Sequence, residues 1–447
     1  MRILGVIIDD GLNGLAHISH VGEKMSEILN GLTIAKSRRG LSGRVLKVLY
    51  KRAIERILVY AAPAWWTGSV SQITKITSVQ RKVLLAVTGA FRTTSTIALQ
   101  VASGIEPIDL ICERERVMYL VKHRAPFITF LGVGLDILNI DLYVESWKHP
   151  SSIPPVQWDK NSNNPTPAIY TDGSKLDGHV RAAFCVFGND VSGEFQYHLQ
   201  DHCSVFQAEL LAIQQALHWK KANLPSDTCH VYTDSMSSLK ALQKLKAENN
   251  LVESVRDQLD PTVQLHWVKA HVGFAGNEAA DKAADSACAK DRVDIHLGAP
   301  FNSFRTMIRQ KILEAWQNKW DDVNEKIGRF THRIFTKVET NRCIVDRYVI
   351  QAVINHGLCP FYLKKFNLQD CNCQCGEDSQ DGTPHFILWC PQVQHLRKFL
   401  AWIMSIPGLM PGMDIIQAIS DSRGIQEIRT ILSFVFQRQM DLFEDNI

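Results

Sequence analysis

The chain has 447 residues, of which 45% are hydrophobic and 21% charged, so its composition excludes a wholly disordered protein and predicts two to four domains. Its longest nearly apolar stretch, residues 57–66, is about half of what a membrane-spanning helix needs, and its acidic start does not fit a signal peptide, so we expect neither membrane insertion nor secretion. The net charge is +3, but residues 1–125 hold 18 Lys and Arg against 9 Asp and Glu, which fits either a polyanionic partner or ordinary solvated helices.

The first 125 residues predict a mainly helical region after a short apolar strand at residues 3–8. Eight basic residues lie between positions 36 and 56 with a single acid, and Lys47 and Lys51 repeat at helical spacing beside an apolar face. Such a helix can lie along a phosphate backbone, where every neutralised phosphate adds salt-dependent affinity.

A proline-rich segment separates this region from the next. Residues 149–167 contain five prolines among Ser and Asn residues and continue neither a helix nor a central strand, so we predict a linker over residues 126–167. Beyond it, three strands followed by strand–helix alternation predict a mixed sheet with helices packed on it. The predicted strands are residues 169–171, 182–187, 195–199, 230–233 and 263–268, and the predicted helices are residues 204–221, 235–245 and 277–289.

Four carboxylates stand at positions typical of a ligand site. Asp172 and Asp234 each end a predicted strand, whereas Glu209 and Asp281 lie on predicted helices. Because strand ends converge on one rim of an α/β sheet, we expect the four to meet there. Taken singly, Asp172 fits a turn residue and Asp234 a helix cap, but four acids in this order favour a shared site.

A cluster of like charges needs a cation, or else some of its pKa values rise. Oxygen ligands select Mg²⁺, and two such ions about 4 Å apart stabilise the attacking and leaving oxygens of a phosphoryl displacement. His271 lies on a predicted loop ten residues before Asp281, where it can move a proton to the leaving group. The pattern therefore predicts metal-dependent phosphodiester chemistry.

Residues 168–290 resemble the type-one ribonuclease H domain. The matching segments are Tyr-Thr-Asp-Gly-Ser at 170–174, Gln-Ala-Glu-Leu-Leu-Ala-Ile at 207–213, Tyr-Thr-Asp-Ser at 232–235, and residues 271–281. The resemblance implies an α/β fold with a mixed five-stranded sheet and flanking helices. It also implies an endonuclease that uses water to cut the RNA strand of an RNA–DNA hybrid and leaves a 5′-phosphate.

The resemblance also implies roles for individual residues. Two Mg²⁺ ions, which Mn²⁺ can replace, would be bridged by Asp172, and His271 would assist product release. Gly173, Ser174 and Asn277 match positions that contact the substrate, the first two at 2′-hydroxyls across the minor groove. The metal ligands that the resemblance implies are Asp172, Glu209, Asp234 and Asp281.

Two departures from the family pattern affect substrate binding. Met236 stands where cellular members usually carry Gln, which removes one substrate contact. The interval from Asp234 to Asp281 is also shorter than in bacterial members and leaves little room for their basic handle helix. Hybrid binding is therefore expected to use basic surface elsewhere, and the N-terminal helices are the candidates.

The N-terminal region is similar to the part of non-LTR retrotransposon reverse transcriptases that follows the palm. Asp9 and Asp10 look like a polymerase metal motif, but their neighbours place them downstream of it, so we interpret both as structural. We expect no polymerase activity from this chain, which resembles the C-terminal part of a longer polyprotein or a decayed copy. The segments that carry the similarity are residues 3–9, 57–66, 79–82 and 88–95.

The remainder of the chain divides by pattern into three predicted regions. They are a helical connector at residues 300–350, a Cys/His segment at residues 355–395 and C-terminal helices at residues 396–447. Four of the 11 cysteines fall between positions 371 and 390, and in a chain that is not secreted this clustering indicates a metal rather than disulfides.

The Cys/His segment holds a ligand set typical of tetrahedral structural Zn²⁺. Cys371 and His356 are competing ligands, and buried cysteines without a metal are the alternative. A similarity to the C-terminal cysteine–histidine segment of the same retroelements favours the first set and implies help in binding template nucleic acid. Its members are Cys373, Cys375, His385 and Cys390.

We therefore predict an α/β ribonuclease H-like domain flanked by a helical thumb-like region and a small zinc-binding region. The leading function is Mg²⁺-dependent cleavage of RNA–DNA hybrids by a retroelement-derived protein, and the alternative is an inactive fragment that only binds nucleic acid. Integrases and exonucleases share this sheet with other acid sets, but Asn277 and Glu278 beside Asp281 argue against them. Nuclear residence is an expectation from the behaviour of retroelements.

Overall fold

The computed structural model divides into two compact units. The sheet unit comprises residues 135–308, and the helical unit combines residues 1–134 with residues 309–447. Among the described residues, no helix has both the length and the apolar character that crossing a bilayer demands. The structure describes residues 1–39, 41–125, 127–135, 140–141, 143, 148–149, 151, 153–160, 165–188, 192–247, 249–287, 292–322, 327–368, 372–376, 382–406 and 413–444.

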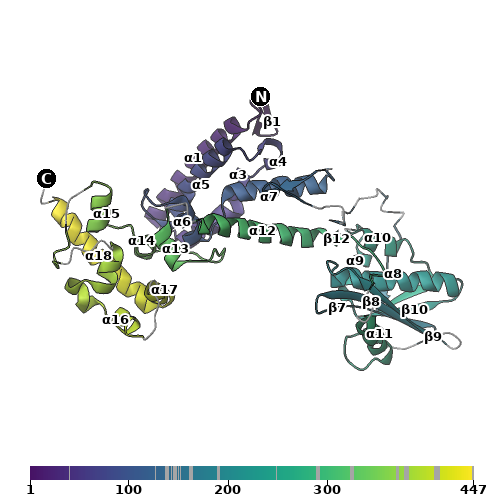
Figure 1. The fold of residues 1–447 in the computed structure, drawn as a ribbon. Helices are drawn as coiled ribbons and strands as arrows, with labels where there is room; N and C mark the ends of the chain where they lie inside the picture. The colour runs from purple at the N-terminus through teal and green to yellow at the C-terminus, as the bar shows by residue number, and fades with distance from the viewer. Residues whose placement is uncertain are drawn as a thin grey trace. The chain divides into compact units, whose positions relative to one another are not determined.

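A six-stranded sheet organises the sheet unit, and its strand order is β6-β11-β10-β7-β8-β9. Figure 1 shows this sheet together with its helices. Strands β7, β8 and β9 form an antiparallel meander, whereas β6, β11, β10 and β7 run parallel to one another. The predicted mixed α/β sheet is thus confirmed. The strands are β6 (Trp158–Asp159), β7 (Ala168–Leu176), β8 (His179–Phe187), β9 (Ser192–Leu199), β10 (Cys229–Thr233) and β11 (Val263–Trp267).

The sheet has one strand more than the five predicted, because a segment of the predicted linker forms the edge strand β6. Trp158 packs against the core of the sheet unit, and Asp159 Oδ1 lies 2.5 Å from His266 Nδ1 on the neighbouring strand β11. A strand of two residues next to prolines has no readable alternation, so only these tertiary contacts reveal it.

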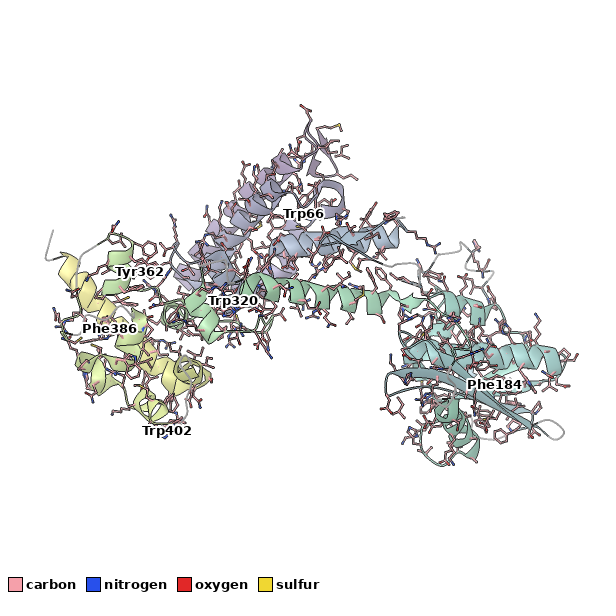
Figure 2. The ribbon with its side chains drawn as sticks, viewed as in Figure 1. Trp66, Phe184, Trp320, Tyr362, Phe386 and Trp402 are labelled. Atoms are coloured by element: carbon pink, nitrogen blue, oxygen red, sulfur yellow. The ribbon has the colours of Figure 1, made fainter. Side chains whose placement is uncertain are left out.

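Helices cover both faces of the sheet, with α8 on one side and α11 on the other (Figure 1). Strand β8 alternates accordingly, since Val180 and Phe184 belong to the core beneath α8, whereas Ala183 and Cys185 belong to the core beneath α11. Figure 2 places Phe184 inside the sheet unit. The helices are α8 (Val205–Asn223), α9 (Met236–Gln243), α10 (Asn250–Arg256), which no prediction covered, and α11 (Ala275–Ser286).

The N-terminal part of the helical unit packs around Tyr50, Trp65 and Trp66, all of them buried. The strand predicted at residues 3–8 is instead a tight hairpin, because Leu4 and Gly5 adopt positive φ values of 46° and 88°. The elements are β1 (Arg2–Ile3), β2 (Val6–Ile7), α1 (Leu15–Arg39), α2 (Gly43–Leu49), a π-helical segment (Tyr50–Ile54), α3 (Glu55–Leu58), α4 (Ala62–Trp65), α5 (Val70–Thr88), α6 (Thr96–Ser103) and α7 (Ile108–Lys122).

Two of the basic side chains that predicted a phosphate-binding helix instead form hydrogen bonds and ion pairs within the helical unit. Lys47 Nζ donates to the carbonyl oxygens of Thr340 at 2.9 Å and Arg342 at 2.6 Å. Lys51 Nζ lies 2.8 Å from carboxylate oxygens of both Glu55 and Glu106. These two cations therefore hold the unit together and do not form a free stripe along the helix.

The C-terminal part of the helical unit builds a second core around α18. Outside this core, Trp316 and Trp320 are also buried. Trp320, labelled in Figure 2, donates from Nε1 to the carbonyl oxygen of Phe335 at 2.7 Å. The elements are α12 (Phe301–Asp321), which runs across the division between the units, α13 (Arg329–Ile334), α14 (Arg347–Ile354), α15 (Pro360–Lys365), a π-helical segment (His385–Trp389), a 3-10 helix (Pro391–Leu396), α16 (Phe399–Met404), α17 (Met413–Ser420) and α18 (Ser422–Glu444). Short strands complete the chain as the pairs β3 (Thr129–Phe130) with β4 (Val133–Gly134) and β5 (Ile140–Asp141) with β12 (Ala299–Pro300).

Candidate active site

Two of the predicted carboxylates lie at equivalent positions on neighbouring strands, at the same level of the sheet. Thr171 of β7 pairs with Thr233 of the parallel strand β10, and the next residue of each strand is Asp172 or Asp234. Asp172 lies within β7, and Ser235, not Asp234, caps α9 by accepting from the Ser238 amide. The local roles of turn residue and helix cap are therefore wrong for both acids.

Glu209 reaches the same place from the first turns of α8, because this helix lies very close to β7. Ser204 caps α8 and forms a capping box with Gln207, which fixes where the helix begins. A Cβ atom at Gly173 would overlap the backbone of Glu209, so glycine is required where the strand and the helix meet.

The structure brings Asp172, Glu209 and Asp234 together, with one carboxylate oxygen of each lying within 4.8 Å of the other two. Asp172 and Glu209 are each only 7% exposed. Within the described part of the chain, Asp172 Oδ2 and Glu209 Oε2 are buried without a hydrogen-bond partner. Buried acceptors of this kind are costly unless a cation or a proton satisfies them.

The electrostatic cost of the cluster shows in its pKa values. Burial, and then the charges of Asp234, Asp281 and Asp285, raise the pKa of Asp172 to about 7. Burial and the charges of Asp172 and Asp234 raise the pKa of Glu209 well above its usual range. The site therefore holds more negative charge than it can keep ionised without a positive ligand.

Asp281 lies at the rim of this cluster and not within it. Its carboxylate is outside the set of oxygens within 4.8 Å, and its Oδ2 lies 3.6 Å from Nδ1 of His271. The His271 side chain is 76% exposed on a loop where its φ is +53°. The predicted fourth ligand and the predicted proton carrier thus face each other beside the three buried acids.

Contacts that the sequence did not indicate hold the rim in place. Asn277 Nδ2 donates to Asp234 Oδ2 at 3.2 Å, and Trp267 Nε1 donates to the Asp234 carbonyl at 3.0 Å. Arg181 is fully buried and lies 3.5 Å from Asp285 in the last turn of α11, the helix that carries Asp281. A single arginine in the otherwise apolar run of residues 180–187 was the available signal for this anchor.

The predicted substrate contacts lie next to the acids. Gly173 and Ser174 continue β7 beyond Asp172, and the Ser174 hydroxyl is buried without a partner among the described residues. Asn277 is buried and its Oδ1 has no partner in that part of the chain, although its amide nitrogen is bound to Asp234. Met236 begins α9.

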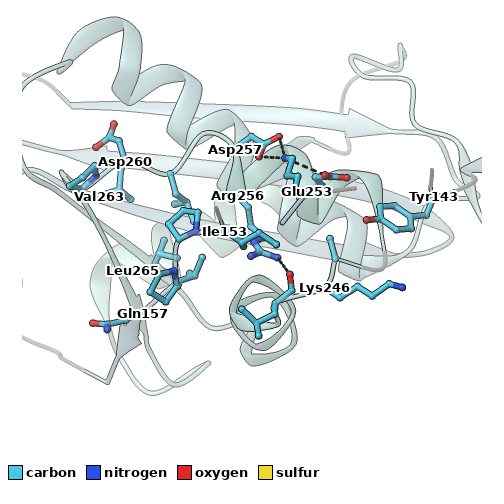
Figure 3. Close-up of a pocket in the computed structure, with 18 residues that line it drawn as sticks. Tyr143, Ile153, Gln157, Lys246, Glu253, Arg256, Asp257, Asp260, Val263 and Leu265 are labelled. Carbon is cyan, nitrogen blue, oxygen red and sulfur yellow. Dashed lines mark hydrogen bonds and ion pairs between the residues drawn. The ribbon is translucent and has the colours of Figure 1, made fainter. Parts of the chain in front are cut away.

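A cavity of about 880 Å³ lies elsewhere in the sheet unit, between linker residues 153–157 and the segment around α10 and β11 (Figure 3). None of the four candidate carboxylates lines it. Most of its charges are paired, since Lys148 Nζ lies 2.8 Å from Asp257 and 3.3 Å from Glu253, and Arg256 donates to backbone carbonyls. The cavity therefore reflects how the linker packs and is separate from the acidic site.

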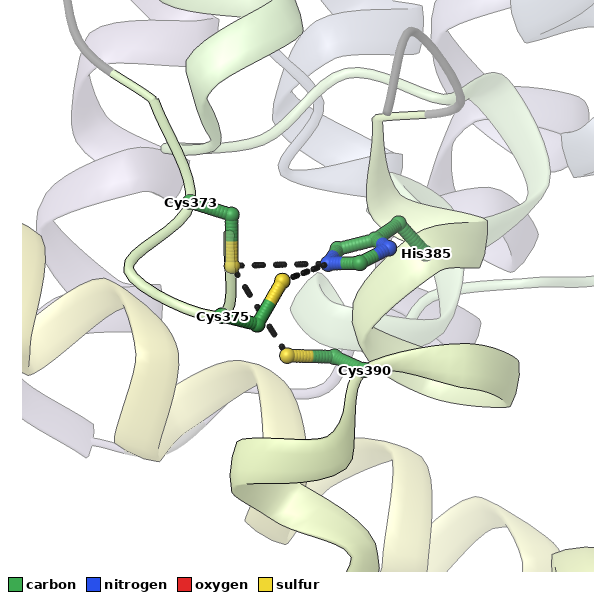
Figure 4. Close-up of side chains that lie close together, drawn as sticks. All are labelled: Cys373, Cys375, His385 and Cys390. Carbon is green, nitrogen blue, oxygen red and sulfur yellow. Dashed lines mark hydrogen bonds between the residues drawn. The ribbon is translucent and has the colours of Figure 1, made fainter. Parts of the chain in front are cut away.

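The predicted Cys₃His set is assembled in the helical unit (Figure 4). Cys373 Sγ lies 3.7 Å from Cys390 Sγ, and His385 Nε2 lies 3.4 Å from Cys373 Sγ and 3.5 Å from Cys375 Sγ. Zinc–ligand bonds of about 2.3 Å to sulfur and 2.0–2.1 Å to nitrogen place tetrahedral ligands roughly 3.5–3.8 Å apart. The spacing of the four side chains fits that geometry.

Local structure explains how these four residues meet. Cys373 and Cys375 lie on one loop. His385 begins a single π-helical turn and Cys390 follows it, and the Cys390 amide donates to the His385 carbonyl at 2.7 Å. Burial and the neighbouring thiols raise the pKa of Cys373 to about 12, so the site needs a metal ion to hold a thiolate. The competing ligand His356 is not part of the cluster, and Cys371 lies outside the described residues.

A third group of possible ligands, His179, His198 and Asp201, lies at the ends of β8 and β9. His179 and Asp201 are largely exposed, and His179 Nδ1 lies 3.0 Å from Asp201 Oδ1. This contact accounts for their proximity without a metal ion.

Residues 164–289 match the family model described as RNase H. This part of the chain is a ribonuclease H domain. The match begins just before β7 and ends just after α11. It therefore contains the three clustered acids, Asp281 with His271, and the helices α8 and α11 that cover the two faces of the sheet.

The chain is also similar to proteins of insect retrotransposable elements. It is 29% identical over 128 residues to a 115 kDa protein in the type-1 element R1DM of Drosophila melanogaster, covering 28% of this chain and 12% of that protein. It is 26% identical over 201 residues to a Pol polyprotein from the type-1 element R1 of Popillia japonica, covering 43% of this chain and 77% of that protein. A Pol polyprotein from the element R1 4 of Nasonia vitripennis is 29% identical over 124 residues, 28% of this chain and 31% of its own length.

These matches confirm the resemblance to a ribonuclease H domain within a non-LTR retrotransposon polyprotein. The chain spans less than a third of the length of two of these three relatives. The match to the Popillia japonica protein, over 201 residues, is longer than the ribonuclease H region.

Proposed function

We propose that the ribonuclease H domain hydrolyses the RNA strand of RNA–DNA hybrids with the help of two Mg²⁺ ions. The observation that carries this proposal is the set of three carboxylates within 4.8 Å, two of which have a buried oxygen without a partner in the described part of the chain. The domain match supports the substrate class. All the donors are oxygens, which favours Mg²⁺ or Mn²⁺ over softer metals.

In this proposal each acid has a place in holding the ions. Asp172, Glu209 and Asp234 would hold the two ions, and Asp281 would complete the set from the rim. Bound together, the ions would stabilise the attacking and leaving oxygens of an in-line displacement at phosphorus. His271, exposed and 3.6 Å from Asp281, would carry a proton to the departing oxygen.

Recognition of the RNA strand is assigned to the residues that follow Asp172. Gly173 and the Ser174 hydroxyl would contact 2′-hydroxyl groups, which distinguish RNA from DNA. The free acceptor of Asn277, Oδ1, would bind the substrate while its amide nitrogen keeps Asp234 in position.

Cleavage of a labelled RNA–DNA hybrid by the full chain in Mg²⁺ tests the proposal. Asp234→Asn removes one of the clustered charges and should lower the rate by at least about a hundredfold while hybrid binding persists. Asp177→Asn is the matched control, because Asp177 lies in the β7–β8 turn with a φ of +52° that asparagine tolerates.

Two results would decide against the enzyme. If the intact protein does not cut the hybrid, and Asp234→Asn binds it as tightly as the natural chain, the domain is a binding module that has lost its activity. If Asp234→Asn cuts as fast as Asp177→Asn, the carboxylate cluster is not the reaction centre.

We also propose that Cys373, Cys375, His385 and Cys390 hold one structural Zn²⁺. The tetrahedral spacing of the four ligand atoms supports this site. The zinc content of purified protein should fall by about one ion per chain in Cys390→Ser and stay the same in Cys343→Ser, whose thiol lies outside the cluster. Unchanged zinc in Cys390→Ser would remove the site.

We propose, finally, that residues 1–125 are a thumb-like region of a reverse transcriptase. The similarity to the Popillia japonica polyprotein over more residues than the ribonuclease H domain supports a retroelement origin beyond that domain. Exposed arginines on the α2 and α3 segment, such as Arg44, Arg52 and Arg56, would add affinity for the nucleic-acid backbone.

A further inference from the structure

A cavity of about 290 Å³ with polar and apolar walls lies within the helical unit. Residues 93–95, which precede α6, form one wall, and residues 327–331, at the start of α13, form another. The ends of α14 and α15 close it. Residues 88–95 are among the segments that mark the N-terminal region, yet hybrid cleavage in the sheet unit gives them no role.

Hydroxyl groups and an imidazole form a hydrogen-bonding wall of the cavity. His356 Nδ1 lies 3.3 Å from Thr93 Oγ1 and 3.4 Å from Thr94 Oγ1, and Thr93 Oγ1 lies 2.9 Å from the Tyr362 hydroxyl. Burial and the charge of Lys365 lower the pKa of His356 to about 4, so this imidazole is neutral at pH 7. The wall thus offers both donors and acceptors.

The charged side chains that line the cavity are all positive among the described residues. Arg329 and Lys365 line it, and none of the described residues that line it is acidic. Lys365 Nζ lies 5.8 Å and 5.7 Å from the ring centroids of Phe361 and Phe366, both of which also line the cavity and are half-buried. Cations beside aromatic rings are the combination that binds a phosphate and a base together.

We propose that this cavity binds a 5′-phosphorylated nucleotide. The two cations attract the phosphate, the aromatic rings contact the base, and the Thr93 and Thr94 hydroxyls with His356 form the hydrogen bonds. The volume is close to the lower end, about 300 Å³, of the usual range for small-ligand sites, which suits one nucleotide and excludes a base pair. The nucleotide is either free or one unit of a single strand.

The test uses the full chain with its metal sites loaded and two probes, deoxythymidine monophosphate and a 5′-phosphorylated octathymidylate. Neither probe is an RNA–DNA hybrid, so the result does not depend on the proposed nuclease. Lys365→Gln should weaken binding by about tenfold, the loss of one charge-assisted hydrogen bond. Lys364→Gln, which makes the same charge change at an exposed neighbour that does not line the cavity, should change binding less than about twofold.

A second variant separates the cavity from general surface charge. Thr93→Phe fills the mouth without altering the charge and should weaken binding as much as Lys365→Gln, provided that circular dichroism shows an unchanged helix content. Tight binding of the monophosphate would identify a free nucleotide as the ligand, and binding of the octamer alone would identify a single strand.

Two outcomes would overturn the proposal. One is equal loss in the Lys364→Gln and Lys365→Gln variants, which would assign the binding to non-specific attraction by the surface. The other is the absence of any binding that depends on Lys365 or Thr93 with either probe.

Discussion

Protonation of Asp172 links the acidic site to the stability of the sheet unit. Burial and the neighbouring charges of Asp234, Asp281 and Asp285 raise its pKa to about 7. The unfolded chain releases this proton near pH 4, whereas the folded protein keeps it until about pH 7. The folded state is therefore penalised increasingly as the pH rises from about 4 to 7, and the whole penalty applies above pH 7.

Replacing Asp172 by Asn should remove this penalty. In Mg²⁺-free buffer at pH 8, Asp172→Asn is expected to raise the free energy of unfolding by on the order of 2–4 kcal/mol, and at pH 4 to change it little. Urea denaturation at both pH values measures the difference, without a chelator so that the Cys₃His site is left intact. Asp177→Asn serves as the control, and a loss of stability in Asp172→Asn at pH 8 would contradict the assigned pKa direction.

Among individual residues, the sequence identifies the acids of the site better than it identifies the residues that hold those acids in position. Asp172 and Glu209 stand in recognisable segments, so their type and order were enough to name them. The anchoring of α11 by Arg181 and the orientation of Asp234 by Asn277 depend on which elements face each other. No local pattern contains that information, because the partners are far apart along the chain.

The close approach of β7 and α8 depends on Gly173. Gly173→Ala would place a Cβ against the backbone of Glu209, where neither element can yield easily. We expect it to lower the free energy of unfolding by about 1–3 kcal/mol and to reduce hybrid cleavage, because Glu209 moves with its helix. Chemical denaturation and the cleavage assay give the two readouts.

Gly31 provides the matched control for this substitution. It lies within α1 with nothing within 4 Å of an added Cβ, so Gly31→Ala should raise stability by up to about 1 kcal/mol. If Gly173→Ala also keeps full stability and full cleavage, the strand and helix are not held as closely as described.

The basic side chains of the N-terminal helices have two different roles: some stabilise the fold, and others are proposed to bind nucleic acid. Lys47→Met should cost about 1–3 kcal/mol of stability, because it leaves the carbonyls of Thr340 and Arg342 without a donor. Arg52→Gln, at an exposed position, should leave stability unchanged but reduce the salt dependence of nucleic-acid binding by about one phosphate contact. Thermal unfolding and salt titrations of binding distinguish them, and the opposite assignment of effects would refute this division.

Elements were predictable where periodicity runs for several turns or along whole strands. The meander, α8 and α11 all follow from such patterns. Strand β6 and the hairpin at Leu4 and Gly5 could not be predicted from the sequence pattern. The strand is only two residues long, and the hairpin depends on two positive φ values. Short elements carry too few residues for a pattern, and tertiary contacts decide them.

On the scale of the whole molecule, the two proposed metal sites belong to different units. The acids lie in the sheet unit and the Cys₃His cluster in the helical unit. Removing zinc with a chelator should lower the unfolding temperature of the helical unit, whereas hybrid cleavage should return in full when Mg²⁺ is added back in excess. Calorimetry and the cleavage assay measure this, and a permanent loss of cleavage would show that the units depend on each other.

The helical unit is built from both ends of the chain, and this has a consequence for its synthesis. Gly43 lies against Val345, and Lys47 binds the backbone of Thr340 and Arg342, so the core of the first segment is completed by the last. On the ribosome, the contiguous sheet unit has all of its residues before that segment emerges. The nascent N-terminal helices therefore keep apolar surface uncovered until residues 340–345 have been synthesised, which makes these helices a natural point of contact for chaperones.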